Sequence, residues 1–202
     1  HRIAYLVSQK KVFPSRILAV TFTNKAAKEM RNRLANLLDE NAEDRRFMPW
    51  MGTFHSICVR ILRIDGVHIG LDPRFVIYDS DDQLGLIKQQ MRARGLTDRD
   101  IKPRSVAAAI SNAKNSLTSA SDFADSASGP TQQKIAELFL AYETAIQKAS
   151  ALDFDDLLVK TVELLRQKPE IRQKWQSQFE HILIDEYQDT NAVQYALVKL
   201  LI

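Results

Sequence analysis

Two adjacent carboxylates, Asp185 and Glu186, directly follow the apolar run His181–Ile184, which is typical of a buried strand. Such a strand delivers both side chains to its end, where one could hold Mg²⁺ and its neighbour could orient or deprotonate a water. Phosphoryl transfer needs this charge neutralisation and an in-line nucleophile more than covalent help. Carboxylates also end many strands simply because they prefer water, so the pair alone does not decide the function.

Two more polar clusters follow predicted strands. Thr21–Lys25 comes after the run Arg16–Phe22, and Thr53–Ser56 comes after Phe47–Thr53. Short hydroxyl and amide side chains at a helix N-terminus, together with free backbone N–H groups, can bind phosphate without a lysine. Sites on parallel sheets lie at the carboxyl ends of the strands, so we expect these two clusters and the acidic pair to share one edge.

Two aromatic residues in these clusters leave alternatives open. Phe22 could stack on a nucleic-acid base or could close the strand as a core residue, and the two interpretations carry similar weight. His55 could contact a ligand or could be a hydrogen-bonded residue at a helix start. The four histidines are scattered and the single cysteine, Cys58, is expected in the core, so no zinc spacing is present.

The remaining pattern places these clusters on an α/β scaffold. Helical spacing follows each of the first two strands, with Thr23 or Asn24 as a cap and with Ala27, Met30, Leu34 and Leu37 expected on one inward face. Residues 72–150, named here the helical segment, are mostly helical, with one short strand at 75–78, a capping box at Ser80 and a loose join over 116–131. Asp153 is expected to cap the next helix, and Pro169 to open another.

This order predicts an α/β fold with a RecA-like parallel sheet of the P-loop NTPase type, interrupted by an inserted, mostly α-helical subdomain. We expect a first sheet part over 1–71, the inserted subdomain over 72–150 and a second sheet part over 151–202.

Composition excludes several other classes. The 202 residues are 45% hydrophobic and 26% charged, which suits a globular domain rather than a disordered tail. One cysteine cannot form an internal bridge, and no run is long enough to span a membrane, so we expect a cytoplasmic protein with no membrane partner. Residues 1–70 hold twelve Lys or Arg against six Asp or Glu, whereas residues 151–202 hold six against nine. A basic first part suits phosphate partners, although solvated charged faces are common.

Four motifs together closely resemble the UvrD/Rep/PcrA-type DNA helicases of superfamily one. AVTFTNKAAKEM (19–30) is similar to that family's motif Ia, GTFHS (52–56) to motif Ib, LDFDDLL (152–158) to the segment after the inserted subdomain, and IDEYQDTN (184–191) to motif II. The motifs occur in the family's order, and the resemblance covers essentially the whole chain.

The resemblance implies an ATP-dependent motor that moves 3′ to 5′ on single-stranded DNA, with ATP and Mg²⁺ as cofactors. Asp185 would hold the Mg²⁺ of MgATP, Glu186 would activate the hydrolytic water, and Gln188 would relay the nucleotide state to the DNA groove. The implied DNA contacts are Thr21, Phe22, Thr23, Asn24, Thr53, His55 and Ser56. The implied partners are single-stranded DNA, junctions of single and double strands, and repair or replication proteins.

The sequence departs from the family pattern in one respect. None of its six glycines belongs to a GxxxxGK[ST] loop, so the phosphate cradle and its lysine are absent from these residues. We therefore expect the chain to be the front part of a longer helicase and to be inactive alone. Two alternatives stay open: a related helicase–nuclease, and a non-catalytic module that binds DNA or a partner. A metal-dependent nuclease built from Asp153, Asp155 and Asp156 is less favoured, because helix capping already explains these residues.

Overall fold

The computed structural model describes residues 1–44 and 46–202, and its centre is a parallel sheet of three strands. The strands are β1 (Ile17–Thr21), β2 (Met51–Thr53) and β5 (His181–Ile184), in the order β2-β1-β5. Side chains of β1 alternate between two apolar clusters: Ile17 and Ala19 pack on one face of the sheet, and Leu18 and Val20 on the other. The expected parallel α/β fold is therefore confirmed.

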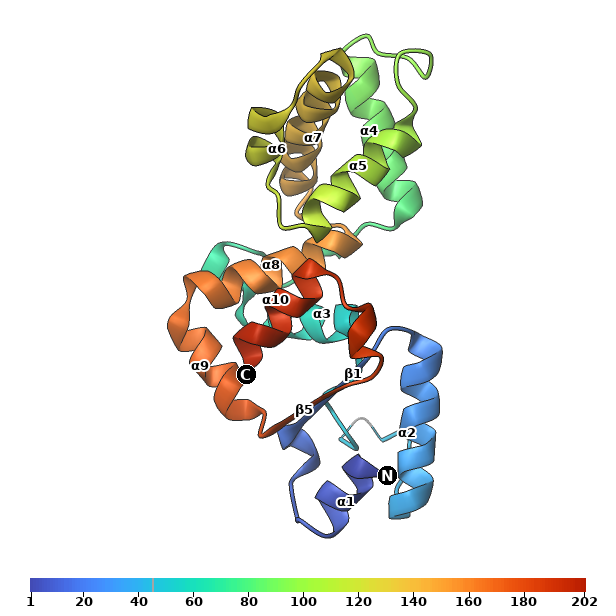
Figure 1. Ribbon diagram of the computed structural model, residues 1–202, viewed down its shortest axis with the longest axis vertical. Coiled ribbons are helices and arrows are strands. Elements are labelled where there is room, and N and C mark those ends of the chain that lie inside the picture. The colour runs from blue at the N-terminus through green and yellow to red at the C-terminus, as the bar shows by residue number, and fades with distance from the viewer. Residues whose placement is uncertain (45) are drawn as a thin grey trace.

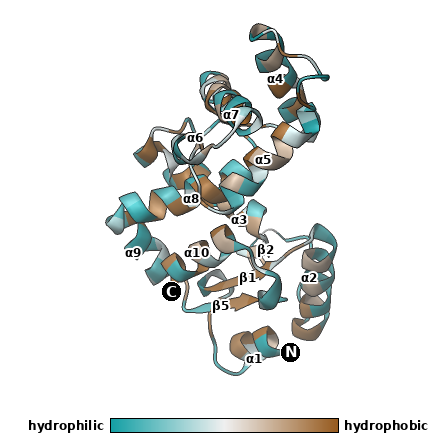
Figure 2. Cartoon of the chain, turned by 45° about the horizontal axis from the view of Figure 1, so that its top comes forward, coloured by the Kyte–Doolittle hydropathy of each residue, from teal (hydrophilic) through white to brown (hydrophobic). Residues whose placement is uncertain are grey.

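Helices cover both faces of this sheet. Parallel strands cannot be joined by a tight hairpin, so helical crossover connections link them and pack on the sheet. On one face lie α1 (Arg2–Ser8) and α2 (Asn24–Leu38). On the other lie α3 (Phe54–Asp65), α8 (Phe154–Gln167), α9 (Pro169–Gln178) and α10 (Ala192–Leu201). Figure 2 shows the strands in hydrophobic colours, as expected for a sheet covered on both faces.

A third apolar cluster is built from four helices, which lie above the sheet in Figure 1. These are α4 (Ser80–Ala93), α5 (Pro103–Asn115), α6 (Ala120–Ser126) and α7 (Pro130–Lys148). The chain enters and leaves this helical part through a short parallel pair, β3 (Val76–Ile77) and β4 (Ala151–Leu152). Three 3₁₀ turns complete the elements, at Pro14–Arg16, Gly66–Ile69 and Tyr187–Asp189.

Several local expectations are confirmed. The hydroxyl of Thr23 accepts a hydrogen bond from the Ala26 amide and caps α2. Asp153 caps α8 through a reciprocal capping box, and Cys58 is fully buried. Pro103 and Pro169 each stand in the first turn of a helix, where a missing N–H costs nothing.

Two strand predictions need correction. Only the last three residues of the predicted strand 47–53 are in β2, because the carbonyl oxygens of Phe47 and Met48 accept hydrogen bonds from the Arg31 guanidinium and hold this stretch in a turn. The strand His181–Ile184 is present but half-buried rather than buried, because β5 is an edge strand among the described residues.

Three helix details also differ from expectation. Asp79, not Ser80, caps α4, because its carboxylate accepts from two backbone amides and Asp82 returns the bond. The expected join over 116–131 contains α6, which its own capping box at Ser119 stabilises. Leu37 is 47% exposed, because α2 turns Leu34 and Ala35 toward the sheet instead.

Across residues 1–44 and 46–202, the helices are each too short or too polar to traverse a lipid bilayer.

Candidate nucleotide and nucleic-acid site

The carboxyl ends of the three sheet strands form one edge, named here the carboxyl edge. Thr21 pairs with Thr53 across β1 and β2, and Val20 pairs with Ile184 across β1 and β5. The Asp185 amide continues the ladder by donating to the Val20 carbonyl at 3.0 Å. The three polar clusters predicted from the sequence are therefore brought together, although 132 positions separate Thr53 from Asp185.

The acidic loop, residues 185–191, begins with a sharp change of direction after β5. Glu186 has a backbone φ of +52°, in the left-handed region that non-glycine residues adopt at a cost of order 1 kcal/mol or more. Its carbonyl accepts from the Asp189 amide at 2.9 Å, which closes the Tyr187–Asp189 turn. Asp185 thus stays aligned with the sheet while Glu186 turns away from it. Both carboxylates are exposed and free of ion pairs within the described residues.

The residues of this loop fit a magnesium ion only in part. Mg²⁺ is usually held by one or two carboxylates together with phosphate oxygens and water. Asp185 can supply one such carboxylate, and the described residues contain no group of three or more His, Cys, Asp or Glu side chains that could hold a metal by themselves. The donor set therefore suits an ion that arrives with a phosphate ligand rather than a metal held by protein alone.

Gln188 and Asn191 occupy the second half of the acidic loop. The Gln188 side chain is exposed and donates to the Asp189 carboxylate at 3.3 Å. Asn191 caps α10, since its Oδ1 accepts from the Gln194 amide at 2.9 Å and the Gln194 side chain returns the bond. The loop is therefore anchored at both ends, by β5 and by α10, with Gln188 free to meet a ligand between them.

The Thr21–Asn24 cluster combines buried support with exposed polar groups. Thr21 is 1% exposed and its hydroxyl donates to the Thr23 carbonyl at 3.1 Å, so it shapes the loop from behind. Thr23 and Asn24 are exposed at the N-terminus of α2. Phe22 is half-buried, with its ring edge-on to Phe54 at a centroid distance of 5.6 Å. One part of the Phe22 ring is therefore core and another part is accessible.

The Thr53–Ser56 cluster opens α3 beside it. Thr53 is buried and its hydroxyl caps the helix by accepting from the Ser56 amide, while the Ser56 hydroxyl donates back to the Thr53 carbonyl at 2.8 Å. A Cβ atom at Gly52 would overlap the Ser56 hydroxyl, which explains the glycine at that position. Ser56 itself is exposed at the start of α3.

His55 is the titratable group of this cluster. Its ring lies edge-on to Phe154 at 5.9 Å, and burial lowers the pKa of His55, an effect that the nearby Asp155 carboxylate partly offsets. His55 is therefore neutral at pH 7.5 and can offer a hydrogen bond rather than a charge.

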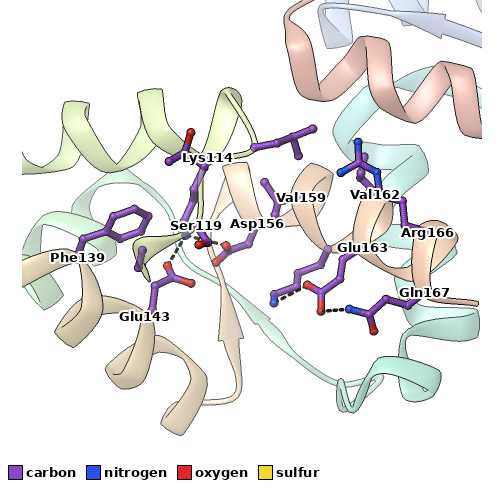
Figure 3. A pocket seen from close by; sticks show the side chains of 14 residues that line it. Lys114, Ser119, Phe139, Glu143, Asp156, Val159, Val162, Glu163, Arg166 and Gln167 are labelled. Atoms are coloured by element: carbon purple, nitrogen blue, oxygen red, sulfur yellow. Dashed lines mark hydrogen bonds and ion pairs between the residues drawn. The ribbon is translucent and has the colours of Figure 1, made fainter. Parts of the chain in front are cut away.

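Sequence reasoning missed a buried charge cluster between the helical part and α8. Lys114, at the end of α5, is 4% exposed and its Nζ lies 2.8 Å from Glu143, 2.8 Å from Asp153 and 2.7 Å from Asp156. Figure 3 shows Lys114 between Glu143 of α7 and Asp156 of α8. These three residues line a cavity of about 370 Å³. Tyr142 donates its hydroxyl to Asp153 at 2.8 Å.

The electrostatics of this cluster follow from burial and pairing. Burial alone would lower the pKa of Lys114, but the three carboxylates outweigh it and raise that pKa. Burial raises the pKa of Asp156 to about 7, against the attraction of Lys114. A nuclease site at these residues is not supported, because Asp153 and Asp156 are buried, form the capping box of α8 and pair with Lys114. One signal was available in the sequence: Lys114 stands four residues after Ile110, on the apolar face of its helix.

The fold and the carboxyl edge together define the class of protein. A parallel α/β sheet that carries an acidic pair at the end of one strand, with polar helix starts at the ends of its neighbours, is a RecA-like domain of the P-loop NTPase class. The sequence model of the UvrD/REP helicase N-terminal domain matches residues 1–202. The chain belongs to this helicase family.

Curated relatives agree with this assignment. The chain is 45% identical over 201 residues to the ATP-dependent DNA helicase PcrA of Bacillus subtilis (strain 168), with 100% of this chain and 27% of the relative covered. It is 45% identical over 202 residues to the enzyme of the same name from Leuconostoc citreum, with 100% and 26% covered. The enzyme of that name from Staphylococcus aureus (strain Mu50 / ATCC 700699) is 44% identical over 201 residues, with 100% and 27% covered. The chain thus spans about a quarter of the length of these relatives.

Proposed function

We propose that this chain is the part of an ATP-dependent DNA helicase that carries the hydrolytic carboxylates and one wall of a single-stranded DNA path. The observation that carries the proposal is the register of the sheet, which aligns Thr21 with Thr53 and ends β5 beside β1. One edge therefore holds both the groups suited to phosphoryl transfer and those suited to a nucleic-acid backbone. Family membership supports the same assignment.

On the nucleotide side, each residue has one role. Asp185 would hold the Mg²⁺ that accompanies ATP, and this ion neutralises charge on the phosphates when bound. Glu186 would orient and deprotonate the attacking water, because it offers an exposed carboxylate next to Asp185 at the end of β5. Gln188, exposed in the middle of the acidic loop, would sense the nucleotide and relay its state toward the DNA.

On the DNA side, Thr23, Asn24 and Ser56 would bind phosphates through hydroxyl, amide and backbone N–H groups at the starts of α2 and α3. The exposed part of Phe22 would stack on a base, and neutral His55 would donate or accept a hydrogen bond. Thr21 and Thr53, which are buried, would hold these two loops in position. Stacking and backbone contacts carry little sequence preference, which suits a motor that moves along DNA.

The division of labour along the chain is part of the proposal. We assign 1–71 and 151–202 to the RecA-like unit and 72–150 to an inserted subdomain, because the described helices 80–148 enclose their own apolar cluster. The substrates would be single-stranded DNA and its junctions with duplex, with 3′ to 5′ movement, in repair or replication in the cytoplasm.

Binding of single-stranded DNA to residues 1–202 tests the DNA half of this proposal. Fluorescence anisotropy of a labelled oligothymidylate should show weak binding that falls as salt rises and changes little when the sequence is mixed. If a folded preparation does not bind the oligonucleotide at low salt, the proposed DNA-binding surface is contradicted. The ATP half is tested separately, because the full-length protein should hydrolyse ATP faster when single-stranded DNA is present.

A further inference from the structure

Three segments that are distant in the sequence meet at the side-chain amide of Asn115, the last residue of α5. Its Nδ2 donates to Asp155 Oδ1 at 2.8 Å and to the Ser111 carbonyl at 2.9 Å. Its Oδ1 accepts from Asn191 Nδ2 at 2.7 Å. Asparagine suits this place because one short side chain offers both a donor and an acceptor.

One of these contacts reaches the acidic loop. Asn191 ends that loop and uses Oδ1 to cap α10, so Nδ2 is the part of its amide that reaches Asn115. The bond that Asn191 donates to Asn115 therefore fixes the end of the acidic loop relative to α5. Asn191 stands six positions after Asp185.

The other contact reaches the DNA side of the site. Asp155 lies in the first turn of α8, next to Phe154, whose ring meets the edge of His55. The Asp155 carboxylate also acts electrostatically on the His55 imidazole. The first turn of α8 thus touches the Thr53–Ser56 cluster on one side and Asn115 on the other.

Asn115 is held rigidly at this junction by its neighbour. Lys114 binds Asp153 and Asp156 at the start of α8, which are buried, and Glu143 of α7, which is partly exposed. Buried hydrogen bonds from Lys114 to Asp153 and Asp156 tie the end of α5 to the start of α8. The end of α5 and the start of α8 therefore move as one unit, so a displacement of Asp155 reaches Asn191 through Asn115.

We propose that Asn115 is a positioning residue that links the Thr53–Ser56 cluster, through the first turn of α8, to the acidic loop. DNA bound at the Thr53–Ser56 cluster would thereby change the geometry of the acidic loop, where ATP is hydrolysed. This inference rests on the proposed function, since it assigns the path by which DNA stimulates ATP hydrolysis.

The test uses the full-length protein with Asn115→Ala, Asn191→Asp and the double variant. Asn191→Asp keeps a capping oxygen for α10 but replaces the Nδ2 donor with a carboxylate oxygen. Asn112→Ala is the control, because Asn112 lies on the same helix but is exposed. For each variant, the rate of ATP hydrolysis is measured with and without single-stranded DNA, together with DNA affinity and thermal unfolding.

We expect the stimulation by DNA to fall about 5-fold in each single variant, while hydrolysis without DNA stays within about twofold of wild type in Asn115→Ala, which lies outside the acidic loop. The double variant should be no worse than Asn115→Ala alone, because that variant already lacks the bond that Asn191→Asp removes. The control should match wild type.

Three outcomes would overturn the inference: unchanged stimulation in folded Asn115→Ala, additive effects in the double variant, or equal losses with and without DNA that follow thermal stability. If Asn115→Ala fails to fold, Asn191→Asp decides by the same criteria. Failure of the proposed function is a different result, because the wild-type protein itself would then show no DNA-stimulated hydrolysis.

Discussion

The rings of Phe22 and Phe54 meet edge to face, with an interplanar angle of 62° and centroids 5.6 Å apart. Phe54 is 3% exposed and belongs to the core beneath α3, whereas Phe22 is half-buried at the carboxyl edge. The core thus supports the Phe22 ring from one side and leaves another side accessible. The two interpretations of Phe22 drawn from the sequence therefore describe two parts of one ring.

Replacement of Phe22 separates these two parts. Phe22→Leu keeps apolar contact with Phe54 but removes the aromatic face, so we expect single-stranded DNA affinity to fall by about 1–3 kcal/mol, or about 5- to 140-fold. Thermal unfolding should change little, since the edge-to-face pair contributes about 0.5–1.5 kcal/mol. Phe13→Leu is the control, because Phe13 is 74% exposed outside the carboxyl edge. A stable Phe22→Leu variant with wild-type affinity would leave Phe22 a core residue only.

Thr23 allows the cap of α2 to be separated from a phosphate contact. Thr23→Asp keeps a capping oxygen for the Ala26 amide but places a negative charge where we propose a phosphate, so DNA affinity should fall about 5-fold at low salt with stability retained. Thr23→Ala should instead cost about 1 kcal/mol of unfolding free energy. Thr23→Ser serves as the control for both measurements. Equal DNA binding by Thr23→Asp and Thr23→Ser would show that phosphate does not approach this helix start.

Glu186 is the proposed base for the attacking water. In the full-length protein, Glu186→Gln should slow ATP hydrolysis at least ~100-fold, because the base is lost, while MgATP still binds through the rest of the site. Single-turnover hydrolysis and nucleotide binding are measured side by side. Glu170→Gln, an exposed residue in the first turn of α9, should behave as wild type. Unchanged turnover in Glu186→Gln would remove this residue from the mechanism.

Loss of Lys114 should strongly destabilise the fold. Lys114→Met leaves Glu143, Asp153 and Asp156 close together without their cation, which should cost about 3–5 kcal/mol of unfolding free energy at pH 7.5. Lys160→Met is the control, because its ion pair with Glu163 is partly exposed and should be worth under about 1 kcal/mol.

The loss of unfolding free energy in Lys114→Met should depend on pH. Without the lysine, the pKa values of the three carboxylates in the folded state rise above those of the unfolded chain. At pH values between the unfolded and the folded pKa values, the folded variant then binds more protons than its unfolded chain. The loss of unfolding free energy is therefore largest at pH 7.5 and becomes smaller toward pH 5. Urea unfolding at both pH values measures this difference. A loss that is equal at both values would contradict the assigned charges.

The 202 residues alone should not hydrolyse ATP. Affinity for a triphosphate depends largely on backbone N–H groups and a lysine around the phosphates, and the sequence contains no glycine loop that provides them. Purified residues 1–202 should therefore show neither DNA-stimulated ATPase activity nor unwinding. DNA-dependent hydrolysis by this chain, in a preparation free of other helicases, would show that the active site is misplaced.

The parts of the fold that the sequence predicted are those in which one local rule dominates. Strand β1 is short, apolar and rich in β-branched residues, and α3 combines a threonine cap with regular apolar spacing, so both were correctly placed. Phe47 and Met48 have the same apolar character, but Arg31, sixteen and seventeen residues away, binds their carbonyl groups and holds a turn. No local pattern contains that contact.

The candidate site shows the same limit. The grouping of the three polar clusters followed from one rule on parallel strands, and the register confirms it. The cluster around Lys114 depends on how α5, α7 and α8 meet, and the sequence separates its members by up to 42 positions. In the sequence, the only sign of such a cluster is a lysine on the apolar face of a predicted helix.

The parallel pair of β3 and β4 has a consequence for how this molecule can change. Val76 lies beside Ala151, so the chain returns to its point of departure after the four helices, and a module with adjacent ends can be lengthened, shortened or exchanged without disturbing its host. Lys114 restricts that freedom, because the module supplies the cation for two carboxylates that belong to α8. A chimaera that takes these helices from a relative must therefore import a lysine at the equivalent position, or replace Asp153 and Asp156 with uncharged residues.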